Sequence, residues 1–156
     1  MKTKYLALIA LAIFALAFTA CKDEPENNPP PPKPIEVTFN VPDECTNLNK
    51  TKPITILFPA TFTTARMDNI KGKFVDSMAG LEERAGKSSE FKTKINAILD
   101  RGLTITINET DSPLSNRFEV VDSQLVVGSA YIEHSGVSSG NVAATIIWLI
   151  NNGDLQ

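Results

Sequence analysis

Apolar and polar residues alternate without a break along Ile35–Val41, so that Glu36, Thr38 and Asn40 fall on one side of the segment. Residues 103–108 repeat this period of two, which is the spacing of a β-strand with one buried face. The shorter apolar segment 54–58 is also typical of a strand. The pattern therefore predicts three strands in the first two thirds of the chain.

Between these strands the apolar period lengthens to three or four residues, which predicts two amphipathic helices. Thr63 or Thr64 can cap the first helix, Ser88 or Ser89 can cap the second, and Gly102 follows its end. The apolar stripes are Met67, Ile70, Phe74, Met78, Leu81 and Ala85 in the first helix, and Phe91, Ile95, Ile98 and Leu99 in the second. We expect Val37, Phe39, Ile105 and Ile107 to pack against Phe74, Met78, Ile95 and Ile98.

The last third of the chain predicts three more strands, over residues 117–121, 125–133 and 142–150. The segment 142–150 is apolar on both sides, and its β-branched residues favour a central strand over the alternative of a buried helix. The stretch 135–141 then becomes the tip of a hairpin. The predicted fold is α+β, an antiparallel sheet of about five to six strands with two helices packed on one face.

The N-terminus has the pattern of a secretory signal. Lys2 and Lys4 precede an uncharged apolar run, Tyr5–Ala20, which is short for a membrane span of about 20 residues. The run ends in Phe18-Thr19-Ala20-Cys21, which resembles the lipobox of bacterial lipoprotein precursors. The resemblance implies cleavage before Cys21 and lipid on Cys21, so that the chain is held at a membrane. An uncleaved anchor helix and secretion after a different cleavage are the alternatives.

The residues after Cys21 indicate where the anchor is delivered. Lys22-Asp23-Glu24 is similar to the export signature of surface lipoproteins of Bacteroidota, which implies the outer face of the outer membrane, with the periplasmic face as the alternative. The proline-rich segment that ends at Pro34 favours extended polyproline II, which is typical of a spacer. The predicted organisation is a signal peptide over 1–20, a lipidated cysteine and tether over 21–34, and one domain over 35–156.

Charge and composition exclude several classes of function. The net charge is −3, and the basic residues are not clustered as a nucleic-acid surface requires. His134 is the only histidine, so the sequence predicts neither a metal site nor a cofactor. With Cys21 carrying lipid, Cys45 has no partner for an intramolecular disulfide.

The sequence assigns no catalytic residue. Cys45 is a possible nucleophile, but no base is placed near it, and a buried or loop thiol is the favoured interpretation. Neighbouring Glu82 and Glu83 point in different directions on a helix, which favours a solvated face over a carboxylate pair. The oxygen-rich segment 108–112 lacks the spacing of an EF-hand loop and is interpreted as a turn.

Two candidate binding surfaces remain. One surrounds Tyr131 and His134, near the predicted hairpin tip, and the other is the polar sheet face that includes Thr104 and Thr106. The favoured function is a non-enzymatic binding or accessory module with a protein or glycan ligand, attached to the membrane by its lipid. The alternative is a small hydrolase or protease-modulating protein whose site forms only on folding.

Overall fold

A computed structural model describes residues 30, 32–114 and 117–156 of the chain, and Pro32–Gln156 forms one compact unit. Cys21, Lys22, Asp23 and Glu24 lie outside the described residues.

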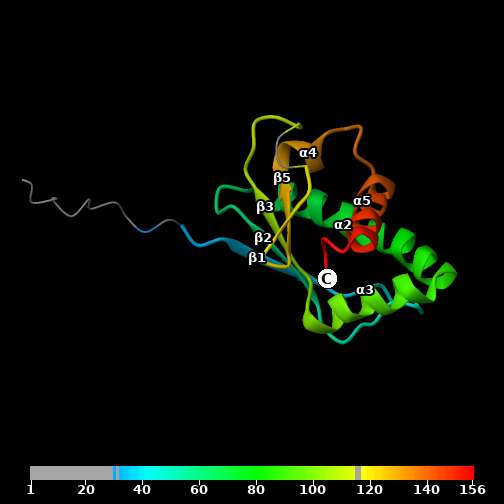
Figure 1. Ribbon diagram of the computed structural model, residues 1–156. Coiled ribbons are helices and arrows are strands. Elements are labelled where there is room, and N and C mark those ends of the chain that lie inside the picture. Colours follow the sequence, from blue (N-terminus) through cyan, green and yellow to red (C-terminus); the bar gives the residue numbers. More distant parts are fainter. Residues whose placement is uncertain (1–29, 31, 115–116) are drawn as a thin grey trace, which may run out of the picture. The chain divides into compact units, whose positions relative to one another are not determined.

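The described unit is built on a five-stranded sheet with the order β1-β2-β3-β5-β4 (Figure 1). The strands are β1 (Ile35–Phe39), β2 (Ile54–Phe58), β3 (Thr104–Asn108), β4 (Glu119–Val121) and β5 (Gln124–Gly128). The α+β class is confirmed, but the sheet is mixed rather than antiparallel. β1 and β4 are antiparallel to their neighbours, whereas β2, β3 and β5 run parallel to one another. The parallel pairing of β2 with β3 arises because two helices lie between them and return the chain to the end at which β2 began.

These two helices, α2 (Thr64–Lys87) and α3 (Ser89–Arg101), confirm the periodicity and the predicted ends. The Thr63 side chain accepts a hydrogen bond from the backbone N–H of Arg66, and Ser88 accepts one from Phe91. Gly102 follows α3 with φ of 92°, a conformation that is costly for residues with a side chain. The predicted contact layer is also confirmed, with Val37 partly buried and the other members buried in one core.

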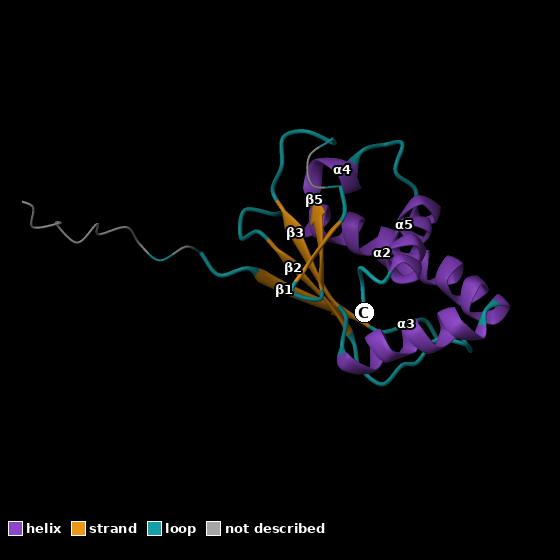
Figure 2. Ribbon diagram, viewed as in Figure 1, coloured by secondary structure: helices purple, strands orange, loops and turns teal. Residues whose placement is uncertain are grey.

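The segment 142–150 is not a strand. It lies within a third long helix, α5 (Ser139–Asn152), which begins at a capping box between Ser138 and Asn141 and ends at left-handed Gly153. Its buried residues recur at helical spacing: Val142, Ala143, Ile146, Leu149 and Ile150. Figure 2 shows α2, α3 and α5 on the same side of the sheet. The segment forms a helix for two reasons. The side chains of Ser138 and Asn141 accept hydrogen bonds from backbone N–H groups at its start. The helical spacing also buries the apolar stripe in the core shared with α2.

The predicted strand 125–133 is shorter than expected. β5 ends at Gly128, and the chain turns at once into the short helix α4 (Ser129–Glu133). Residues 135–141 therefore connect two helices and are not a hairpin tip. The turn is held by the segment that follows β3, because Thr110 N–H donates to Ser129 Oγ at 3.1 Å and Ala130 N–H donates to Thr110 Oγ1 at 3.2 Å.

Candidate interaction surface

Tyr131 and His134 lie together, as the sequence predicts, but on and just after a helix. Both line a hollow of about 250 Å³ whose other walls include Leu114 and Arg117. His134 is the C-cap of α4, and its Nδ1 accepts a hydrogen bond from Gly136 N–H at 3.1 Å. The ring therefore lies at the exposed end of a helix, beside an aromatic side chain.

Thr104 and Thr106 lie elsewhere, on the sheet face opposite the three long helices. The strand register places Thr38, Thr55 and Thr104 side by side across β1, β2 and β3, and pairs Thr106 with Val126. None of the described residues forms a helix on this face (Figure 2). The structure thus separates the predicted binding residues into two unrelated surfaces.

Three large apolar side chains of the described residues are strongly exposed. They are Leu114, Val121 and Trp148, with exposed fractions of 72%, 49% and 59%. They line three hollows that share residues: Val121 lines one, Leu114 another, and Trp148 two, while Tyr131 also belongs to two. We call the set Leu114, Phe118, Val121, Tyr131 and Trp148 the Trp148 surface.

The largest of these hollows, about 470 Å³, is a groove between the edge strand β4 and helix α5. On the strand side it is lined by Phe118 and the three residues of β4. On the helix side it is lined by Trp148, Leu149 and Asp154. The next hollow, about 290 Å³, continues from Trp148 along α5 to Tyr131. The rings of Phe118 and Tyr131 make an edge-to-face contact, with their centroids 5.7 Å apart.

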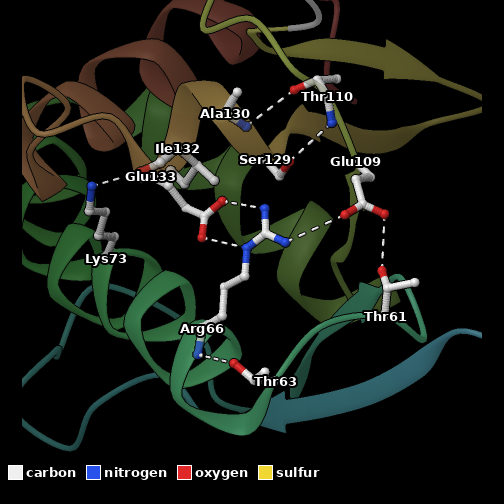
Figure 3. Close-up of polar contacts among 10 residues, drawn as sticks. All are labelled: Thr61, Thr63, Arg66, Lys73, Glu109, Thr110, Ser129, Ala130, Ile132 and Glu133. Atoms are coloured by element: carbon white, nitrogen blue, oxygen red, sulfur yellow. Dashed lines mark hydrogen bonds and ion pairs between the residues drawn. The ribbon is translucent and has the colours of Figure 1, made fainter.

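A polar network fixes α4, which carries Tyr131 (Figure 3). Arg66, in the first turn of α2, donates two hydrogen bonds to the Glu133 carboxylate, at 2.6 and 2.7 Å, and lies 3.6 Å from Glu109. Glu109 in turn accepts a bond from Thr61 Oγ1 at 3.0 Å, and the guanidinium stacks over Phe62. The hydrogen bond to Glu133 raises the pKa of Arg66, an effect that burial opposes. Arg66 at the start of α2 thus binds the loops that follow β2 and β3 and the helix α4, so the network joins segments far apart in the sequence.

Lys73 holds the connection that follows α4. Its Nζ donates to the carbonyl oxygens of Ile132 at 2.6 Å and Val137 at 2.8 Å, and a third carbonyl, that of His134, lies at 3.4 Å. Because three carbonyls of one short segment converge on a single ammonium, this lysine has a structural role. It holds the backbone at Ile132 and His134, next to Tyr131.

Cys45 and the neighbouring Glu82 and Glu83, which the sequence offers for nucleophilic or acid–base chemistry, each have structural contacts. Cys45 is 2% exposed, and burial, followed by the negative charges of Glu82 and Glu44, raises the pKa of its thiol. Glu82 accepts bonds from the backbone N–H groups of Thr46 and Asn47 at 3.0 and 2.9 Å, whereas Glu83 pairs with Lys87 on the surface. Although burial acts to raise the pKa of Glu82, the hydrogen bonds from Asn47 and Thr46 lower it. The two glutamates are separated, as the sequence predicts.

Two residues of the turn after β3 bind other parts of the chain. Glu109 binds Arg66 and Thr61, and Thr110 binds α4. In the described ranges, no group of three or more His, Cys, Asp or Glu side chains is arranged to hold a metal ion. Nor does any helix in these ranges combine the length and apolar character needed to cross a bilayer.

Sequence reasoning missed Trp148. Its signal was present, since a helical period through residues 142–150 leaves Trp148 outside the buried stripe. Comparison of the chain with protein-family models, curated proteins and solved structures found no significant match.

Proposed function

We propose that the chain is a lipid-anchored protein of the bacterial outer membrane, exposed at the cell surface, whose domain is a non-enzymatic binding module. The lipobox ending at Cys21, the residues Lys22-Asp23-Glu24 and the proline-rich tether support the anchor and its side. The Trp148 surface supports the binding role.

The observation that carries the binding role is the gathering of exposed apolar side chains. Contiguous apolar patches on soluble domains mark interaction sites, and tryptophan and tyrosine often dominate the energy of such sites. Arg66 and Lys73 hold α4, which carries Tyr131, so little conformational freedom of this part of the surface is lost when a ligand binds. A protein or a glycan could occupy an aromatic surface of this kind, and nucleic acid is disfavoured by the net charge of −3.

The anchor is tested by changing the two cysteines separately. Cys21→Ser should abolish acylation and correct cleavage, because a hydroxyl cannot form the thioether, whereas Cys45→Ser should change neither. Intact-mass analysis of the membrane fraction measures both. A wild-type chain that is recovered soluble with an unmodified Cys21 contradicts the proposal.

The side of the membrane is tested by replacing Lys22, Asp23 and Glu24 together with alanine. The lipid should remain, but the domain should become inaccessible to protease added to whole cells. Equal digestion of the variant and the wild type would show that these residues do not direct export.

Binding is tested in intact cells by a photoreactive amino acid in place of Trp148, with the same group in place of Glu83 as the control. Both positions are exposed on helices, but Glu83 lines a different hollow and none of the three that define the Trp148 surface. We expect covalent adducts at 148 that are absent at 83. Sensitivity of the adduct to protease or to glycosidase distinguishes a protein from a glycan. The absence of a specific adduct at 148 argues against a binding role for this surface.

A further inference from the structure

The groove between β4 and α5 has a backbone feature that an aromatic patch alone does not have. β4 is the last strand of the sheet order, so one side of its backbone faces outward. A groove bounded by an edge strand and a helix is the geometry in which proteins add a peptide as an extra strand. The groove thus selects for an extended chain.

The β4–β5 turn shows which backbone groups are open. Asp122 and Ser123 have φ of 50° and 63°, so they form a two-residue turn of type I′ between Val121 and Gln124. The turn's hydrogen bond joins Val121 to Gln124, and pairs in an antiparallel ladder alternate between bonded and non-bonded. Val120, which is opposite Leu125, therefore directs its N–H and C=O away from β5, toward the open edge.

The charged side chains that line this groove indicate which charge its occupant carries. Its charged lining residues are Glu119 and Asp154, both acidic. Trp148 and Val121 leave apolar area exposed at the same place. A second copy of this chain would bring the same carboxylates into the interface, which is unfavourable, whereas a basic segment would neutralise them.

We propose that the β4–α5 groove binds an extended segment of a protein partner, which adds to β4 as a sixth strand, places an apolar side chain against Trp148 and directs a basic side chain toward Glu119 and Asp154. This assignment rests on the proposed binding role and names the class of ligand.

The test uses a library of random twelve-residue linear peptides, selected against the detergent-solubilised full chain. We expect selected peptides to carry a basic residue near an apolar or aromatic one. Trp148→Ala should weaken the binding of such a peptide at least tenfold. Glu119→Gln should weaken it several-fold and reduce its dependence on salt. Glu36→Gln, which changes an exposed glutamate on the opposite edge strand, is the matched control and should have no effect.

Backbone pairing is measured by methylating each peptide amide in turn. Addition to a strand should produce loss of binding at alternate amides, because only every second N–H faces β4. An even profile, or a loss that follows the side chains alone, overturns strand addition. Circular dichroism of each variant confirms that the fold is retained.

Other outcomes also decide the proposal. If no peptide is enriched, or if enriched peptides are insensitive to Trp148→Ala, the groove assignment is wrong. Peptides that bind elsewhere leave the general binding role standing, so the two failures are distinguishable. A chain that is dimeric in solution and dissociates with Trp148→Ala identifies a second copy as the occupant, which also overturns the proposal.

Discussion

The packing of α5 on α2 depends on one close approach, at Gly80. A Cβ built on Gly80 would lie 2.8 Å from the Cβ of Ala143, about 1 Å inside the normal contact distance of two carbon atoms. Gly72, in the same helix, has nothing within 4 Å of such a Cβ. The two positions therefore form a matched pair, and alanine at each tests whether the C-terminal segment is a helix in this place.

The two alanine substitutions should change the free energy of unfolding differently. Alanine in place of glycine stabilises a helix interior by about 1 kcal/mol, so Gly72→Ala should raise the free energy of unfolding by up to this amount. Gly80→Ala has the same intrinsic gain, but overpacking against Ala143 costs about 1–3 kcal/mol. Gly80→Ala should therefore be neutral or destabilising, by up to about 2 kcal/mol.

The assay is urea unfolding of residues 32–156, with the two alanine variants compared under identical conditions. Ala143→Gly should restore space for the new methyl group, so the double variant Gly80→Ala with Ala143→Gly should be more stable than the sum of the single changes predicts. If Gly80→Ala stabilises the domain as much as Gly72→Ala does, and the cycle shows no coupling, then α5 does not pack here and the reasoning is refuted.

Two further predictions concern single ionisable side chains. The Cys45 thiol should react with a thiol reagent orders of magnitude more slowly in the folded domain than in denaturant, because the thiol is buried and its pKa is raised. Rapid reaction in the folded state would contradict this burial. Glu82 has a pKa lowered below its ordinary value of 4.5, so its contribution to stability is present at neutral pH and is lost as the pH falls through the lowered pKa. The stability difference between the wild type and Glu82→Gln should therefore shrink as the pH falls below 4.5. A difference that is constant with pH would show that Glu82 does not hold the Thr46–Asn47 turn as an anion.

Local signals predicted the helices α2 and α3 correctly. Their apolar stripes have one period, and Thr63, Ser88 and Gly102 mark the ends by short-range chemistry that the sequence displays directly. The segment 142–150 has apolar residues on both sides, so its periodicity is weak and its β-branched residues favour a strand. The signals for the helix are the capping residues Ser138 and Gly153, which lie outside that apolar run. Helix propensity is a weak prior that packing overrides.

The parallel pairing and the polar network depend on contacts far apart in the sequence. Arg66 and Glu133 are separated by 67 positions, and no local sequence signal predicts that the two side chains meet. Tyr131 and His134 were identified as a surface because they are close in sequence. Trp148 lies near them only because residues 139–152 form a helix. The prediction of a strand over 142–150 therefore left Trp148 out of the predicted surface.

The strand order also has a mechanical consequence. In the proposed anchored state the chain enters the domain at β1, and β4 lies at the opposite edge of the sheet, so tension between the anchored N-terminus and a partner held at β4 would act across the strands. Force applied at Ile35 would open the β1–β2 ladder one pair at a time, from Ile35 toward Phe39, as a zipper opens. Separation of the strands would then reach the loop that precedes β2. There Glu82 accepts hydrogen bonds from Thr46 and Asn47, and Asp100 accepts one from Asn49. β1 can thus yield about 17 Å of slack, at roughly 3.4 Å per residue, while the four remaining strands keep their pairing.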